Sequence, residues 1–385
     1  MKILCLPVLS ACLLVSFNAL SLEWKNECVG YYQLALPDNL EVALYQVEDF
    51  VNPIKQSEYT GPEIKFEKNP FVRNDNSAQA QYSEFYYGQY KLGISSQSRT
   101  PVNWSDYRSK VIADRDAWVK GVWEYQKGNL ERFNESATAA ESEFKRKYNY
   151  IIKDYTDAFA LYENRGYSLT VKKDERLYHF WEKKQKDTGD KSQTAEKQQQ
   201  ESEPEVLSLL NRFQSRKLYQ VPTAQGFCMP YGFIAGDSGH ELRNMGVTYR
   251  LKNHPDVTIF FQDFGPTPGP GKRRPDASMN AKDYVTYFWN MRYGHSFRDI
   301  KPYGKGFSYP DIDNRKAVAA FAKFTRFSKE VDYGYVAFAK GRAADEPDLF
   351  FYVMRDSRQA KDNPPMDKKE LEKLAEHIVS SIKRR

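Results

Sequence analysis

Apolar side chains recur at alternating steps of three and four residues over residues 130–155, which predicts one face of a long amphipathic helix. This face consists of Leu130, Phe133, Ala137, Ala140, Phe144, Tyr148, Ile151 and Tyr155. Trp118, Val122 and Trp123 continue the spacing upstream, so we expect the helix to begin near Ser105. The Gly128-Asn129 pair is expected to kink or break it. Such a stripe packs on a sheet or another helix, or fills a partner's groove.

Much of the remaining chain carries short Tyr-rich and β-branched runs separated by turn residues, a pattern that predicts strands. The expected strands are 30–36, 63–67, 82–92, 167–172, 177–181, 232–235, 245–251, 257–263, 317–327, 333–339 and 349–355. Two further amphipathic segments, 281–292 and 367–383, predict helices. In the second of these, one face is formed by Leu371, Leu374, Ile378 and Ile382.

The same order of features occurs twice along the chain. Cys28-Val-Gly-Tyr-Tyr opens the first half and Cys228-Met-Pro-Tyr-Gly-Phe opens the second. Each half closes with a predicted hairpin, a polar stretch and an amphipathic helix. We therefore predict an α+β fold of two related domains, 22–218 and 219–385, rather than one large sheet. Each domain is expected to be an antiparallel sheet with packed helices, and the first carries the long amphipathic helix.

Residues 183–204 contain almost no apolar side chains. Such a segment cannot bury enough surface to offset its ordering entropy, so it is expected to be a flexible tract. Pro204 stands where a helix can begin. The apolar side of that helix is predicted from Val206, Leu207, Leu209, Leu210 and Phe213.

The first 21 residues have the pattern of a secretion signal, with Lys2 followed by an apolar stretch from Ile3 to Phe17. Ala19-Leu20-Ser21 supplies small residues at a cleavage site, so the mature chain is expected to begin at Leu22. An alternative remains open, because Leu9-Ser10-Ala11-Cys12 matches a lipoprotein box and would leave Cys12 lipidated. Both alternatives place the protein outside the cytoplasm.

Cleavage at Leu22 leaves two cysteines, Cys28 and Cys228. In an oxidising compartment such a pair is expected to form a disulfide, and two separately buried thiols are the alternative. A bond between the openings of the two domains would fix their relative orientation.

Composition excludes some partners. The formal net charge of +6 is modest for 385 residues and the charges are dispersed, so no nucleic-acid partner is expected. No later apolar stretch approaches the roughly 18 residues of a membrane helix, so we expect membrane contact only through Cys12. The aromatic content of 15% suits strands and protein interfaces, although core packing explains most of it.

The sequence contains no recognisable catalytic constellation, metal site or cofactor motif. Gly236-Asp237-Ser238-Gly239 resembles the nucleophile segment of trypsin-like proteases, but only His179 precedes it, and the four residues are typical of a turn. No two histidines have the spacing of zinc ligands. Gly265–Gly271 is rich in glycine, but its prolines remove the donors that a phosphate would need. It is expected to be an exposed loop that leads into Lys272-Arg273-Arg274.

Two segments resemble a family of periplasmic immunity proteins that protect bacteria against type VI secretion lipase effectors, the Tle phospholipases. Phe227-Cys-Met-Pro-Tyr-Gly-Phe-Ile-Ala-Gly-Asp-Ser, with the following Val247–Ile259, is similar to the second domain of the two-domain Tli proteins. Cys28-Val-Gly-Tyr-Tyr-Gln-Leu-Ala-Leu-Pro resembles the start of their first domain.

The resemblance implies a non-catalytic protein that binds a cognate lipase effector in the periplasm and covers its active-site entrance or its lid. It transfers no contact residue, because the matching segments are structural openings of the domains. The alternative is a periplasmic ligand-binding or envelope-binding protein without catalytic activity. An exported hydrolase with an unrecognised site is a third class.

Overall fold

The computed structural model describes residues 23–47, 50, 64–66, 83–98, 100–133, 136–164, 166–182, 192–265, 279–293, 297–341, 346–360 and 363–385. The predicted signal with Cys12, residues 183–191 of the polar tract, and the glycine-rich loop beyond Gly265 with its basic end lie outside the described residues.

One antiparallel sheet of 13 strands runs through both halves of the part of the chain just specified. Its strands from the first half are β3 (Leu40–Val42), β6 (Glu84–Tyr87), β7 (Tyr90–Ile94), β8 (Tyr150–Tyr155), β9 (Ala158–Glu163), β10 (Gly166–Lys173) and β11 (Arg176–Glu182). Those from the second half are β15 (Arg243–Leu251), β16 (Val257–Phe264), β17 (Asp299–Ser308), β20 (Val318–Thr325), β21 (Val331–Ala339) and β22 (Asp348–Arg355). The expected α+β class with antiparallel sheets is confirmed.

The two halves repeat one strand order. From the centre outward the first half runs β6-β7-β11-β10-β9-β8, and the second runs β15-β16-β22-β21-β20-β17. The equivalent strands β6 and β15 pair antiparallel at the centre, with Phe85 opposite Met245. The halves therefore join edge to edge. The sequence-based prediction of two separate sheets rather than one large sheet is wrong in this respect. Hydrogen bonding between the two innermost strands removes the free edge that each half would otherwise expose.

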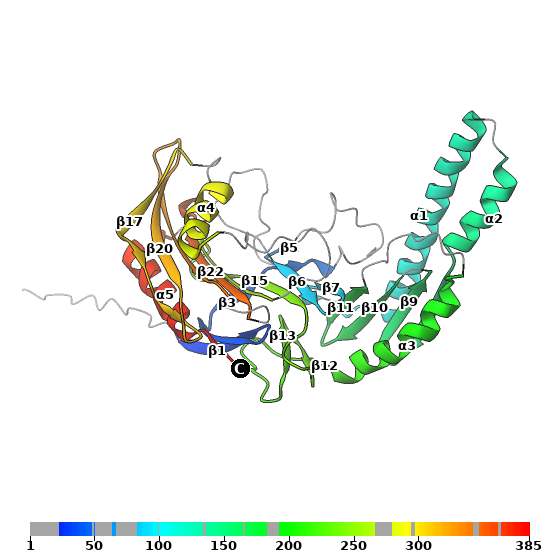
Figure 1. The fold of residues 1–385 in the computed structure, drawn as a ribbon, viewed down its shortest axis with the longest axis horizontal. Coiled ribbons are helices and arrows are strands. Elements are labelled where there is room, and N and C mark those ends of the chain that lie inside the picture. The colour runs from blue at the N-terminus through cyan, green and yellow to red at the C-terminus, as the bar shows by residue number, and fades with distance from the viewer. Residues whose placement is uncertain are drawn as a thin grey trace, which may run out of the picture.

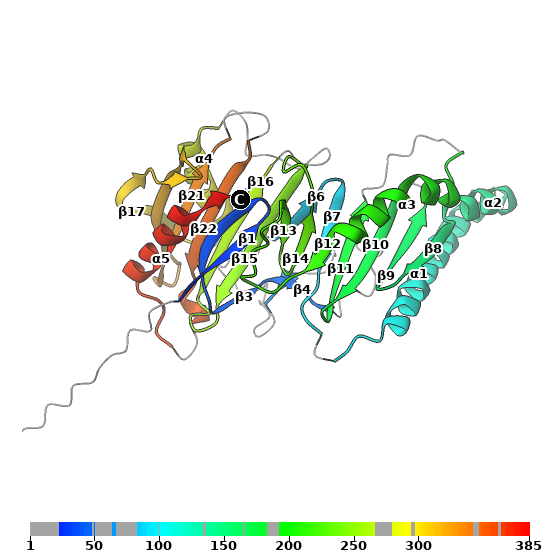
Figure 2. The ribbon, with the colours of Figure 1, turned by 90° about the horizontal axis from the view of Figure 1, so that it is seen from below.

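Five helices flank the sheet in the described residues: α1 (Trp104–Arg132), α2 (Ala137–Lys147), α3 (Ala195–Arg212), α4 (Ala281–Tyr293) and α5 (Lys368–Ser381). A short 3-10 helix, η2, spans Ser357–Gln359. Figures 1 and 2 show α3 and α5 on one side of the curved sheet, and α1 and α4 on the other. The α1–α2 hairpin rises at one end of the molecule (Figure 1).

The predicted long helix is two helices and a strand. α1 ends at Arg132, α2 at Lys147, and Ile151 and Tyr155 belong to β8. Residues four apart share one face in a strand as well as in a helix, so the spacing continued across the change of structure. Gly128 and Asn129 lie within α1, and the break comes four residues later.

The polar tract is also partly corrected, because α3 begins at Ala195 with Thr194 as its N-cap, and Pro204 lies inside the helix. The buried face of α3 includes Gln198 and Ser202, whose side chains hydrogen-bond to each other at 2.6 Å. A helix that buries paired polar side chains leaves little hydrophobic signal in its sequence.

Four small sheets complete the fold in the described residues. They are formed by β1 (Trp24–Val29), β2 (Tyr32–Pro37) and β23 (Lys383–Arg384); by β12 (Phe213–Ser215), β13 (Gly226–Met229) and β14 (Gly232–Ala235); by β4 (Leu44–Tyr45) and β5 (Ile64–Lys65); and by β18 (Asp311–Ile312) and β19 (Arg315–Lys316). The predicted strand 82–92 is the β6–β7 hairpin, because Gly88 takes a left-handed conformation in the turn.

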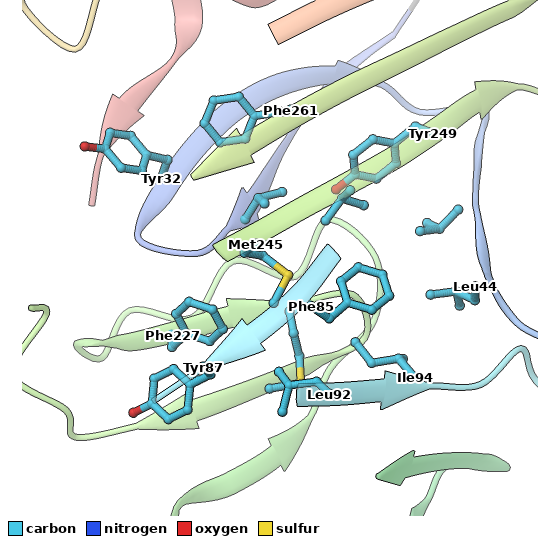
Figure 3. Packing of buried hydrophobic residues seen from close by; sticks show 14 of the residues in the cluster. Tyr32, Leu44, Phe85, Tyr87, Leu92, Ile94, Phe227, Met245, Tyr249 and Phe261 are labelled. Atoms are coloured by element: carbon cyan, nitrogen blue, oxygen red, sulfur yellow. The ribbon is translucent and has the colours of Figure 1, made fainter. Parts of the chain in front are cut away.

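A continuous hydrophobic core connects the halves. Figure 3 shows Phe85, Met245 and Phe227 close together where β6, β15 and β13 meet, and all three are buried. Alternation along the outer strands divides the packing at the second half. Tyr335 and Ala337 face the α5 side, whereas Val336 and Phe338 contribute to a second cluster with α4.

Candidate functional site at the junction of the halves

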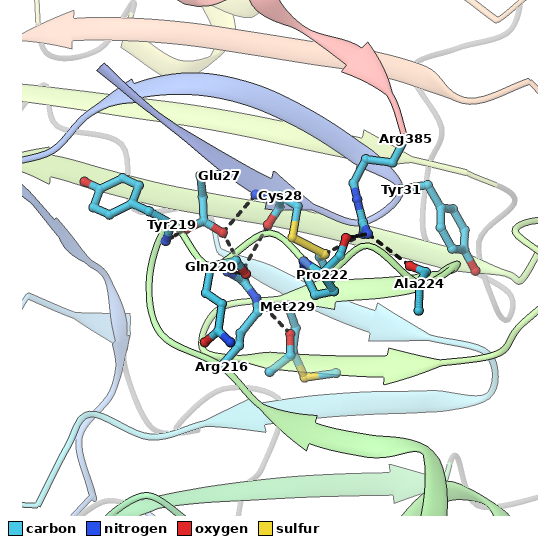
Figure 4. Close-up of a disulfide and its surroundings, with 12 residues drawn as sticks. Glu27, Cys28, Tyr31, Arg216, Tyr219, Gln220, Pro222, Ala224, Met229 and Arg385 are labelled. Carbon is cyan, nitrogen blue, oxygen red and sulfur yellow. Dashed lines mark hydrogen bonds and ion pairs between the residues drawn. A yellow bond between two sulfur atoms is a disulfide. The ribbon is translucent and has the colours of Figure 1, made fainter. Parts of the chain in front are cut away.

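A disulfide joins Cys28 in β1 to Cys228 in β13, with a Cα–Cα distance of 5.7 Å (Figure 4). Gly30 and Cys228 also exchange backbone hydrogen bonds of 2.8 and 2.9 Å. The pair expected from the sequence is thus bonded in the structure. Each cysteine lies in the first strand of a hairpin that precedes one copy of the repeated strand order, so the bond links corresponding positions of the repeat.

A buried ion pair lies beside the disulfide. The carboxylate of Glu27 pairs with the guanidinium of Arg216, and both side chains are almost wholly shielded from solvent. Glu27 also accepts the N–H of Cys28 at 2.9 Å, while Arg216 donates to the carbonyl oxygens of Cys28 at 3.1 Å and Met229 at 3.0 Å. Paired and hydrogen-bonded in this way, the two charges avoid the large cost of isolated burial and fix β1 against β13.

Arg385 lies on the other side of the disulfide, as Figure 4 shows. Its Nη1 donates to Cys228 Sγ at 2.9 Å, and its Nη2 donates to the carbonyl oxygens of Ala224, at 3.1 Å, and Pro222. Its backbone N–H donates to Tyr31 O at 3.0 Å, which extends β23 along β2.

Arg385 also lines an open cleft of about 780 Å³. The walls are Tyr31, Gln33, residues 221–226, residues 238–240 and residues 383–385. Arg384 donates to Gly239 O at 2.9 Å across it. The cleft is therefore cationic on one wall, although both arginines are engaged with backbone carbonyls.

The predicted turn at Gly236–Gly239 is a hydrogen-bonded loop. Ser238 Oγ donates to Glu241 Oε1 at 3.0 Å and accepts the N–H of His240 at 3.1 Å. Asp237 accepts the phenol protons of Tyr31 and Tyr87 at 2.7 and 3.1 Å. Burial, together with the Asp237 carboxylate, raises the pKa of both tyrosines, so both phenols stay protonated as donors. The arrangement positions a turn and leaves Ser238 Oγ beside a carboxylate rather than an imidazole.

His179 is a core residue. Its Nδ1 lies 3.0 Å from Thr170 Oγ1, and its ring is tilted against that of Trp181, with 4.1 Å between the ring centres. Burial, with Lys91 nearby, lowers the pKa of His179 to about 3, so the ring is neutral in the folded protein. It lies in β11, in the other half of the chain from Ser238 in the loop after β14.

Metal-binding clusters and membrane-spanning helices are both absent from the described residues. Among them, no group of three or more His, Cys, Asp or Glu side chains is arranged to hold a metal ion. None of the described helices combines the length and the hydropathy needed to cross a membrane.

Sequence reasoning found the two cysteines but missed the charged groups around them. Glu27, Arg216 and Arg385 come from three distant parts of the chain and share no spacing that could have indicated their contact. The only local signal of these contacts is that Glu27 directly precedes Cys28. This signal is uninformative, because a glutamate beside a cysteine is also ordinary in an exposed strand.

The family described as Tle cognate immunity protein 4 C-terminal domain matches residues 220–267, which include β13 to β16 and Cys228. No curated protein sequence matches the chain significantly.

Solved structures match nearly the whole chain. The immunity protein TplEi of the T6SS from Pseudomonas aeruginosa, complexed with an "L" peptide, is 15% identical with a TM-score of 0.50, and the match covers 94% of this chain and 98% of that one. Its apo structure is 14% identical with a TM-score of 0.50, at 94% and 97% coverage. A chain of the Tle4–Tli4 complex is 15% identical with a TM-score of 0.51, at 94% and 97% coverage. The chain thus has the fold of these immunity-protein structures, and its central segment matches the C-terminal domain family of Tle cognate immunity protein 4.

Proposed function

We propose that this chain is an immunity protein that binds a cognate type VI secretion lipase or phospholipase effector and neutralises it by covering its active-site entrance or lid. The match of residues 220–267 to the Tle cognate immunity protein 4 family carries the proposal. The fold similarity to the immunity proteins, which extends over 94% of the chain, supports it.

The architecture suits inhibition by steric occlusion. The two halves share one sheet through β6 and β15 and are also joined by the disulfide, so their relative orientation is fixed before binding. A preorganised surface loses less conformational freedom when it binds, and this increases affinity. Exposed aromatic side chains, Tyr125 and Phe133 on the α1–α2 hairpin, are of the type that anchors protein interfaces.

We further propose that the protein acts in the periplasm, without catalysis of its own. The signal pattern of residues 1–21 supports export, and an antidote must meet the effector where it arrives. The Ser238 turn supports the absence of catalysis, because its hydrogen bonds are those of a loop.

The proposal predicts that a lipase effector is encoded beside this gene, and the direct test is binding to that lipase and inhibition of its activity. The full chain, purified from the periplasm, is expected to form a stable complex with nanomolar or tighter affinity and to abolish phospholipid hydrolysis. A lipase from an unrelated secretion system is the control and should keep its activity. Absence of a complex together with unchanged hydrolysis by the neighbouring lipase would refute the proposal for that effector.

The cellular location of the protein is tested separately by cell fractionation. Soluble export predicts that the chain appears in the periplasmic fraction and that Cys12→Ser does not change this distribution. If the chain sediments with membranes and Cys12→Ser releases it, the lipid-anchored alternative is correct. A chain that lacks residues 1–21 should bind the purified lipase but fail to protect cells from a periplasmic effector.

A further inference from the structure

The two sulfur atoms of the disulfide lie in unequal electrostatic surroundings. Arg385 Nη1 donates directly to Cys228 Sγ at 2.9 Å, and the other contacts of that guanidinium given above are neutral carbonyl oxygens. The nearest charge to Cys28 along the chain is the carboxylate of Glu27, which accepts the N–H of Cys28. Arg216 donates to the carbonyl oxygens of both Cys28 and Met229, the neighbour of Cys228, and is paired with that carboxylate. Arg216 and the Asp237 carboxylate also act electrostatically on Arg385, with opposite signs.

This asymmetry matters when the bond is absent. A thiolate, rather than a thiol, is the nucleophile in thiol–disulfide exchange, and an adjacent guanidinium stabilises it. In a reduced chain that keeps these contacts, the positive charge of Arg385 favours the thiolate of Cys228. The Glu27 carboxylate does not favour a second negative charge on Cys28.

We propose that the reduced protein reacts with a disulfide donor at Cys228 Sγ. Arg385 is the positioning residue that stabilises the Cys228 thiolate for this step. The donor is a small disulfide, such as oxidised glutathione, or the exposed disulfide of an oxidoreductase. This reaction belongs to the assembly of the molecule and does not depend on lipase binding.

The thiol–disulfide exchange takes place in two steps. The Cys228 thiolate attacks one donor sulfur, forms a mixed disulfide and expels the other donor sulfur as a thiolate, which takes up a proton. Cys28 then gives up its proton and attacks Cys228 Sγ, forming the Cys28–Cys228 bond and releasing the second donor thiolate. Two protein thiols are oxidised, and one donor disulfide is reduced to two thiols.

The cleft provides the side of approach. Arg385 lines its wall and touches Cys228 Sγ, whereas both cysteine side chains are at most 1% exposed in the bonded state. A volume of about 780 Å³ accommodates a peptide-sized donor. Residues 383–385 therefore lie beside a reagent that enters this cleft.

The first test is a thiolate titration of the Cys28→Ser variant, followed by ultraviolet absorbance at 240 nm. A Cys28→Ser/Cys228→Ser variant gives the blank that removes the tyrosine signal. Half-titration of Cys228 is expected to fall about one pH unit or more below its value in Cys28→Ser/Arg385→Ala, as for an opposite charge in contact. Arg385→Lys should retain part of the shift.

Arg384→Ala is the matched control, because Arg384 is the neighbouring cation but bonds to Gly239 O. It should leave the titration of Cys228 within a few tenths of a pH unit. Equal midpoints with and without Arg385, in variants whose circular dichroism shows that they are folded, would overturn the proposal.

A second measurement does not depend on the folding of Cys28→Ser. The reduced full chain is exposed briefly to limiting oxidised glutathione, quenched in acid and mapped by mass spectrometry. Glutathione is expected on Cys228 several-fold more often than on Cys28, and Arg385→Ala should abolish the excess. Equal labelling of the two cysteines in the unmodified chain, or an excess that persists without Arg385, would contradict the inference.

Discussion

Arg243 Nε donates to Asp263 Oδ2 over 2.7 Å, and the same oxygen accepts the backbone N–H of Tyr31 at 3.0 Å. Both charged side chains are at most 1% exposed. The guanidinium also lies 4.6 Å from the centre of the Tyr31 ring. This ion pair between β15 and β16 therefore holds the turn after β1, next to the disulfide, and ties the beginning of the chain to the matched segment 220–267.

Replacing Asp263 by Ala should destabilise the protein strongly, because it leaves Arg243 buried without its partner. Loss of one member of a buried pair costs about 3–5 kcal/mol. Urea denaturation measures the change. The control is Asp311→Ala, which removes the exposed pair with Lys316 and should cost below about 1 kcal/mol. Similar losses for the two variants would contradict the structural role of Asp263.

Gly30→Ala should also be destabilising, for two combined reasons. Gly30 has a φ of +59°, and a Cβ atom there would collide with the carboxylate of Asp263 and lie 2.9 Å from its Cβ. Gly88, with a φ of +55°, has no heavy atom within 4 Å of the same added carbon, so Gly88→Ala isolates the backbone strain. Strain alone costs about 1–2 kcal/mol, and overpacking adds about 1–3 kcal/mol. Thermal or urea unfolding should place Gly30→Ala clearly below Gly88→Ala, and equal stabilities would count against the close packing.

The disulfide should make a large contribution to the stability of the exported protein. The bond spans 200 residues, and the chain-entropy model assigns about 5 kcal/mol to a loop of this size. The Cys28→Ala/Cys228→Ala variant is expected to lose that amount in urea denaturation. A reducing agent should lower the stability of the unmodified protein and leave the double variant unchanged. If the reductant has no effect on the unmodified protein, the two cysteines are separate thiols.

His179 should make stability depend on pH. Its pKa is about 3 in the folded protein, below its usual value, so the unfolded chain binds the proton more readily. The contribution of the neutral ring is complete above about pH 6.5 and is lost as the pH falls towards 3, at up to about 1.4 kcal/mol per pH unit. The difference in unfolding free energy between the unmodified protein and His179→Asn should therefore shrink between pH 7 and pH 4. A constant difference would show that His179 is not buried as a neutral ring.

The sequence by itself determined the local elements whose pattern is unambiguous. Alternating or continuous apolar runs located β10, β11, β14 to β16 and β20 to β22, and the apolar face at Leu371 and Ile378 located α5. The two cysteine-containing openings indicated the internal repeat, because each is followed by the same order of elements. These signals are local, so they can be recognised in the sequence without knowledge of the tertiary contacts.

Tertiary structure decided the rest. Whether the repeats form two sheets or one depends on the pairing of β6 with β15, which are 150 or more residues apart and carry no mark of being neighbours. The helical course of residues 195–204 depends on the sheet against which Gln198 and Ser202 are buried. The sequence made Cys28 and Cys228 candidates for a bond, but only folding brought Glu27, Arg216 and Arg385 around them, because long-range electrostatic contacts have no spacing along the chain.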